Sequence, residues 1–201
     1  MGMAVLKKYK WTWILLAICV ILAGYLLWDT YAKPKLPVIR PVADFSMENV
    51  DGKTVTLQDT NGKVRLFYFF FANCPDVCPI TTFRLSQVQD ILKDKGLFGK
   101  DASIVSITFD PERDTLENVK AFGDKFKADY SGWYFLRGDQ QKTIDLAMES
   151  FKILINQDED GNFVHMDLIG LVDREGRLRE IYRPEATPDE IAAGVVDLVK
   201  E

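Results

Sequence analysis

Two nearly continuous apolar runs, Val64–Phe71 and Ala102–Phe109, constrain the fold of this chain more than any other feature. Each has the length of a strand and carries little charge, which is typical of a strand buried on both faces of a sheet. Each run is followed by apolar residues at helical spacing. Buried strands that alternate with helices predict a mostly parallel sheet with helices packed on its faces.

The rest of the chain extends this pattern with turns, strands and helices. Predicted hairpins pair Phe45–Asn49 with Thr54–Leu57, around Asp51-Gly52, and Met166–Val172 with Leu178–Tyr182. The other predicted elements are, in chain order, a helix through Leu85–Leu92, a helix from about Thr115, a strand at Trp133–Leu136, and helices at Gln140–Met148 and Pro188–Lys200. This order predicts a thioredoxin-like α/β fold, a central mixed sheet with flanking helices.

The N-terminal part of the chain has the composition of a membrane anchor. Residues 11–28 are 18 residues without a charge, close to the length that spans the ~30 Å hydrocarbon layer, with Trp11, Trp13 and Trp28 at the ends. Three lysines precede the run, which favours an N-terminus inside and a domain outside. We therefore expect a cytoplasmic tail at 1–10, a single transmembrane helix at 11–28, a Pro-rich linker at 29–43 and one domain at 44–201.

Other N-terminal signals fit the sequence less well. The apolar run is longer than that of a cleaved signal peptide and ends without a small-residue cleavage site. Cys19 lies inside the run rather than at its end, which argues against lipidation. An Arg- and Ser-rich transit peptide is missing, so a bacterial cell membrane is the expected location.

The net charge of the predicted domain limits which classes of molecule it can bind. The chain carries a formal net charge of −5, and residues 1–44 hold six Lys or Arg against two Asp, so the predicted domain is strongly acidic. An acidic domain without a basic stripe is a poor partner for phosphate backbones, and we expect no nucleic-acid binding. Nothing in the sequence calls for more than a monomer.

A pair of cysteines, Cys74 and Cys78, follows the first apolar run in the segment FANCPDVCP. Residues four apart at the start of a helix lie on one side, so the two sulfurs could share a metal or form a disulfide. The N-terminus of a helix favours the thiolate, which is both the nucleophile and the metal ligand. A structural disulfide is the simpler alternative in an exported protein.

Thiolates and one imidazole point to copper more than to zinc. Soft thiolates select Cu(I) or zinc, and imidazole also accepts Cu(II). Structural zinc takes four ligands, and the predicted domain has one histidine, His165, and no third cysteine. A lone histidine is more often a surface or hydrogen-bonded residue than a ligand, but His165 directly precedes an apolar strand, near a strand end.

The chain resembles the Sco (SenC) family, the copper chaperones of cytochrome oxidase assembly. The resemblance covers most of residues 42–200 and is carried by FANCPDVCP, by ITFDPERDT (107–115) and by His165 ahead of MDLIGLVD. It implies a thioredoxin-like fold in which Cys74, Cys78 and His165 bind copper. It also implies that this copper goes to the binuclear copper site of an oxidase subunit, or that the thiols prepare that site.

Three acidic residues are candidates for supporting the metal ligands from the next layer of residues. Asp110 and Asp114 follow the second apolar run, and Asp76 lies between the cysteines. Helix capping explains Asp114 better, turn formation explains Asp110, and Asp76 could simply be a solvated residue at a helix start.

An alternative function is thiol–disulfide exchange through Cys74 and Cys78, with other thiol redox proteins as partners, or redox sensing without metal transfer. Thioredoxin-type enzymes use two residues between their cysteines, whereas this chain has three. We therefore expect no turnover enzyme, with a thiol–disulfide reductase activity as the alternative. Peroxidase chemistry is not expected, because Phe71 stands where peroxiredoxin-like enzymes place a threonine, three residues before the reactive cysteine.

Overall fold

The computed structural model describes residues 9–31, 36–157 and 163–201, and only the backbone of residues 26–31. The chain divides into two compact units, Met1–Leu36 and Pro37–Glu201. The larger unit contains the predicted strands, helices and site residues. Parts of the predicted tail and linker, residues 1–8 and 32–35, lie outside the described residues.

The first unit contains one long helix, α2 (Lys10–Tyr31), which includes the uncharged run at 11–28. Across the described stretches of the chain, no helix combines the length and the apolar character required for crossing a membrane. The predicted transmembrane anchor is therefore not supported by the structure.

The second unit is built on an eight-stranded mixed sheet in the order β1-β10-β9-β4-β5-β6-β2-β3. Its strands are β1 (Arg40–Pro41), β2 (Ser46–Asn49), β3 (Thr54–Thr56), β4 (Val64–Phe70), β5 (Ala102–Thr108), β6 (Trp133–Arg137), β9 (Ile169–Val172) and β10 (Arg177–Tyr182). The central strands β4, β5 and β6 are parallel to one another, and β9 runs antiparallel to β4. Every residue of β4 and β5 is buried, as their apolar sequences predict.

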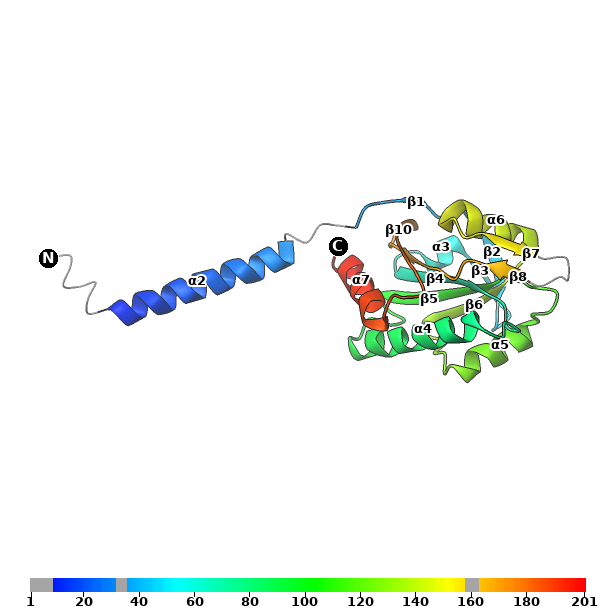
Figure 1. Ribbon diagram of the computed structural model, residues 1–201, viewed down its shortest axis with the longest axis horizontal. Helices are drawn as coiled ribbons and strands as arrows, with labels where there is room; N and C mark the ends of the chain where they lie inside the picture. The colour runs from blue at the N-terminus through cyan, green and yellow to red at the C-terminus, as the bar shows by residue number, and fades with distance from the viewer. Residues whose placement is uncertain (1–8, 32–35, 158–162) are drawn as a thin grey trace. The chain divides into compact units, whose positions relative to one another are not determined.

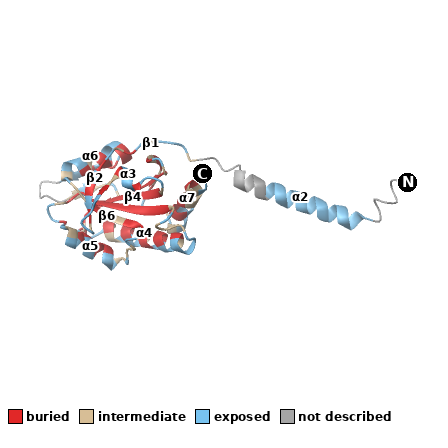
Figure 2. Cartoon of the chain, turned by 180° about the vertical axis from the view of Figure 1, so that it is seen from behind, coloured by how far each residue is buried: buried red, intermediate tan, exposed pale blue. Residues whose placement is uncertain are grey.

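Helices cover both faces of this sheet. They are α3 (Leu57–Thr60), α4 (Val77–Asp94), α5 (Leu116–Lys125), α6 (Gln140–Phe151) and α7 (Pro188–Lys200). In Figure 1, α4 and α5 lie on one side of the sheet and α6 lies on the other. The inner side of α4 presents Leu85, Val88 and Leu92, all fully buried, and Figure 2 shows the core running along the central strands.

Several elements were not expected from the sequence. β1 pairs with β10 inside the segment predicted as linker, and Val42 next to it is buried. A second, two-stranded sheet consists of β7 (Ile155–Gln157) and β8 (Phe163–His165). His165 therefore ends a short strand of its own, rather than preceding the strand predicted from Met166. β7 and β8 have three residues each, too few for alternation alone to identify them.

Candidate metal centre

The site lies at one edge of the sheet, where parallel strands end. β4 and β5 run side by side in parallel register, so their C-terminal ends meet at the same edge. The loop after β4 carries Cys74, and Cys78 is the second residue of α4. His165 is brought to the same place by the separate β7–β8 sheet.

The structure brings together the three predicted ligands. The ligand atoms of Cys74, Cys78 and His165 all lie within 4.8 Å of one another. The Sγ of Cys78 is 3.7 Å from Nε2 of His165, and the backbone N–H of Cys78 points to Sγ of Cys74 at 3.5 Å. Both cysteines are free thiols and both are buried, Cys74 at 8% exposure and Cys78 at 0%.

The histidine presents the correct nitrogen for binding a metal. Nδ1 of His165 lies 3.3 Å from the carbonyl oxygen of Met166, which can only accept a hydrogen bond. Nδ1 is then the protonated nitrogen, and Nε2 turns its lone pair toward Cys78. Burial lowers the pKa of His165, so the neutral, ligating form of the imidazole is favoured.

Aromatic rings surround His165 and connect it to the core. The ring of His165 meets Phe109 edge to face at 5.0 Å between centroids and Phe71 at 6.1 Å. Phe163, two residues earlier on β8, packs on the same two rings at 5.1 and 5.8 Å. The β7–β8 sheet is thus fastened over the ends of β4 and β5 by ring packing.

The protonation of Cys78 differs from the expectation for a helix N-terminus. Burial raises the pKa of Cys78 far above that of a free thiol, and this outweighs the hydrogen bond from the backbone of Phe71, which lowers it. The helix dipole stabilises a thiolate at the first turn by only about 0.3–1 kcal/mol. The desolvation of a buried thiolate costs more free energy than this. Without a metal, Cys78 is held as a thiol.

Asp114 does not cap α5 as predicted. The cap is Thr115, whose hydroxyl accepts the N–H of Asn118 at 3.2 Å. Asp114 is fully buried instead, and its Oδ2 accepts the backbone N–H of Ala72 at 2.9 Å and the hydroxyl of Thr108. This carboxylate ties the cysteine loop to the end of β5, one of the roles considered for it.

Among the described residues, the other two acidic candidates form no hydrogen bond or ion pair with the ligands. Asp110 is buried and forms an ion pair with Arg113, whose guanidinium lies over the ring of Phe163 at 5.6 Å. It therefore supports the aromatic cluster indirectly. Asp76 occupies the N-cap position of α4, but its exposed side chain makes no capping hydrogen bond.

Sequence reasoning missed three polar residues behind the ligands. Thr81, one turn after Cys78 on α4, donates its hydroxyl to Asp167 at 2.7 Å. Tyr68 is fully buried on β4, and burial raises its pKa, with further contributions from neighbouring Cys78 and Asp167. The one sequence signal for these residues was that Asp167 follows His165 by two positions.

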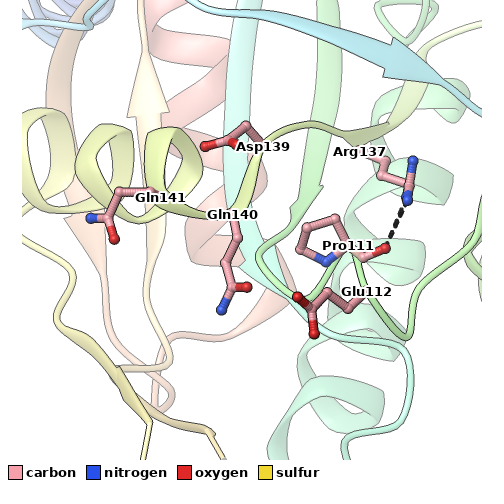
Figure 3. A pocket seen from close by; sticks show the side chains of 6 residues that line it. All are labelled: Pro111, Glu112, Arg137, Asp139, Gln140 and Gln141. Atoms are coloured by element: carbon pink, nitrogen blue, oxygen red, sulfur yellow. Dashed lines mark hydrogen bonds between the residues drawn. The ribbon is translucent and has the colours of Figure 1, made fainter.

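A pocket whose lining includes none of the three ligands is shown in Figure 3. Arg137, at the end of β6, donates to the carbonyl oxygen of Pro111 at 2.8 Å across this pocket. Its lining residues are Pro111, Glu112, Arg137, Asp139, Gln140 and Gln141. None of these is a thiol or an imidazole.

The donor set fits a soft metal ion. Bonds of about 2.3 Å to thiolate and about 2.0 Å to imidazole place neighbouring ligand atoms roughly 3.5–4 Å apart around one ion. The 3.7 Å between Sγ of Cys78 and Nε2 of His165 matches that spacing, and the 4.8 Å limit for all three ligand atoms leaves a small closing movement around an ion. Two thiolates with one imidazole leave a coordination position open for a further ligand.

Comparison with known proteins decides the family. A family model described as SCO1/SenC matches residues 37–200. This chain belongs to the SCO1/SenC family. The SCO1 protein homolog of Bacillus subtilis is 33% identical to it over 165 residues, which cover 80% of this chain and 84% of that protein. The predicted family is thereby confirmed.

Three solved Sco structures share its fold, each at 29% sequence identity. A SCO1/SenC family lipoprotein from Bacillus anthracis has a TM-score of 0.76 and covers 82% of this chain and 99% of its own. BsSco, described with a disulfide switch and as a member of the Sco family of cytochrome c oxidase assembly proteins, has a TM-score of 0.73 and coverages of 83% and 98%. Arabidopsis thaliana ScoI, solved with copper bound, has a TM-score of 0.68 and coverages of 79% and 97%. The predicted mixed α/β, thioredoxin-like fold is confirmed.

Proposed function

We propose that this chain binds one copper ion through Cys74, Cys78 and His165 and acts in the assembly of cytochrome c oxidase. The observation that carries the proposal is the convergence of two sulfurs and one imidazole within 4.8 Å. The copper-bound structure of Arabidopsis ScoI and the description of the Sco family in the BsSco structure support it.

Delivery of copper to the binuclear copper site of an oxidase subunit is the finer part of the proposal. Cys74, Cys78 and His165 would hold the ion, as Cu(I) or Cu(II), which is the cargo rather than a resident cofactor. Binding displaces the proton of Cys78, whose pKa burial has raised. An ion held by only three protein ligands can accept a fourth from a receiving protein before it leaves.

A thiol–disulfide reaction is the second candidate, favoured by the two free cysteines in one site. The thiolate of Cys74, the more exposed of the two, would attack a partner disulfide and release one partner thiol. Cys78 would then attack the mixed disulfide and release the second thiol. Two electrons pass to the partner, which leaves Cys74 and Cys78 as a disulfide. This reaction could prepare the cysteines of a copper site for loading.

The test is a titration of the reduced chain with Cu(I) against a colorimetric chelator, for wild type, Cys74→Ser and Cys78→Ser. We expect one tightly bound ion in the wild type and loss of tight binding in both variants. Retention of tight binding in both serine variants would refute the proposed ligands. Reduction of a disulfide-bonded target peptide by the metal-free chain, without copper binding, would move thiol exchange to first place.

We also propose that the protein works at the outer surface of a bacterial membrane, attached through the segment before residue 37. The relative described as a lipoprotein and the uncharged run at 11–28 support this location. Membrane fractions washed with alkaline carbonate should retain the full chain and release a chain that starts at Pro37. Recovery of both chains in the soluble fraction would contradict membrane attachment.

A further inference from the structure

A hydrogen bond links helix α4, which carries Cys78, to the segment just beyond β8, which ends at His165. Thr81 of α4 donates its hydroxyl to Oδ2 of Asp167, just beyond β8, at 2.7 Å. Thr81 is three residues after Cys78, and Asp167 is two residues after His165. The bond therefore spans the same two elements as the 3.7 Å contact between the sulfur of Cys78 and Nε2 of His165.

The bond is partly buried, between fully buried residues of α4 and β4 and the half-buried Asp167. Thr81 is 1% exposed and Tyr68 is fully buried. The hydroxyl of Tyr68 lies near Cys78 and Asp167, and burial together with these two groups raises the pKa of Tyr68, but among the described residues no well-formed hydrogen bond reaches this hydroxyl or Oδ1 of Asp167. A buried carboxylate oxygen without a partner costs free energy, so Asp167 is not explained by stability alone.

The bond matters because β8 has no backbone pairing with the main sheet. β7 and β8 form a sheet of their own and do not join the eight-stranded sheet. The aromatic packing of Phe163 and His165 fixes their distance from the core, but rings can slide and turn against one another. A directional hydrogen bond to the ligand-bearing helix removes that freedom.

We propose that Thr81 and Asp167 are positioning residues that hold His165 over Cys78 before copper arrives. This inference rests on the proposed function, since it concerns the same three ligands. Ligands held in place by outer hydrogen bonds bind metal more tightly, and loss of such partners typically costs about 10–100-fold in affinity. The bond acts through His165, so its contribution should vanish when His165 is absent.

The experiment compares Thr81→Val with Thr82→Val in the full chain. Both threonines are buried on α4, but the hydroxyl of Thr82 has no hydrogen-bond partner among the described residues, so Thr82→Val is a matched control. We expect Thr81→Val to weaken Cu(I) affinity about tenfold, with Thr81→Ser close to wild type and Thr82→Val unchanged. In a His165→Ala background, Thr81→Val should have no further effect.

A second readout needs no copper. Hydrogen exchange of the backbone amide of Met166, which donates to the carbonyl oxygen of Leu154 at 3.1 Å, should be faster in metal-free Thr81→Val than in Thr82→Val. Equal exchange in the two variants, together with equal copper affinity, would overturn the inference. If wild type fails to bind copper tightly, the proposed function fails, and the exchange comparison still decides whether this bond positions β8.

Discussion

Asp114 is the buried carboxylate that fixes the position of the cysteine loop. It accepts hydrogen bonds from the N–H of Ala72 and the hydroxyl of Thr108, so it joins the segment that precedes Cys74 to the end of β5. Burial raises the pKa of Asp114, and these hydrogen bonds only partly oppose that shift. The folded protein therefore holds this proton at pH values where the unfolded chain has lost it.

The free energy of unfolding should depend on pH in a way that reflects the protonation of Asp114. The contribution of Asp114 to the free energy of unfolding is largest below the ordinary pKa of an aspartate, 3.8, and falls as pH rises through the raised pKa of the folded state. Asp114→Asn keeps an acceptor but does not titrate. The stability difference between wild type and Asp114→Asn should therefore shrink with rising pH, as measured by urea unfolding at a series of pH values.

The exposed residue Asp76 supplies the control for this measurement. Asp76→Asn removes a carboxylate from the same region without disturbing a capping bond. A stability difference for Asp114→Asn that stays constant or grows with rising pH would contradict a raised pKa of Asp114 in the folded protein.

Residue chemistry explains which parts of the site were predictable. Cys74, Cys78 and His165 are rare side chains with few roles, so their spacing and the family resemblance singled them out. Asp114 was predicted as a cap because sequence cannot reveal which of two adjacent residues, Asp114 or Thr115, turns inward. Thr81 and Tyr68 are common residues at ordinary positions, and only the folded contacts give them a role.

At the scale of elements, the site combines residues that follow the buried central strand β4 with a residue of the separate β7–β8 sheet. Cys74 and Cys78 follow β4, which is buried along its whole length, whereas His165 lies on the two-stranded β7–β8 sheet. The long apolar strands were predictable because each carries its own pattern. β7 and β8 were not, because their place is decided by packing against distant rings.

Phe163→Ala should speed local opening of the β7–β8 sheet while lowering the free energy of unfolding of the whole domain only modestly. Phe163 packs on Phe71 and Phe109, but its side chain is only partly buried. We expect a loss of about 1–2 kcal/mol in the free energy of unfolding, below the roughly 3–5 kcal/mol of a fully buried phenylalanine. Hydrogen exchange should accelerate in β8 and remain slow in β4.

Val164→Ala is the matched control on the same strand. Val164 is 64% exposed, so its truncation should change stability by less than about 0.5 kcal/mol. Equal exchange rates in β8 for Phe163→Ala and Val164→Ala would show that ring packing does not fasten the β7–β8 sheet.

At the scale of the whole molecule, the boundary of the folded unit is set by β1. Both the compact unit and the family match begin at residue 37, whereas the sequence placed the start of the domain at residue 44. The proline-rich composition suggested a linker, but Ile39 donates to the carbonyl of Leu178 and Val42 to that of Gly176, each at 2.8 Å. Sequence alone could not show that this short segment joins a sheet edge.

Two shortened chains test this boundary. A chain of residues 37–201 should fold on its own, with the urea midpoint of the same unit in the full chain. A chain of residues 44–201 loses β1 and buried Val42, and should be less stable by about 2 kcal/mol, the value of burying one such side chain. Equal urea midpoints for the two shortened chains would contradict a structural role for β1.

The central claim is that His165 completes a copper site with the two cysteines. The most direct measurement is a Cu(I) competition titration of reduced wild type and His165→Ala, with disulfide formation by Cys74 and Cys78 followed in parallel. We predict one tightly bound ion in the wild type, a loss of affinity of roughly 100-fold in His165→Ala, and unimpaired disulfide formation in both. Equal copper affinity in the two proteins would contradict the three-ligand site.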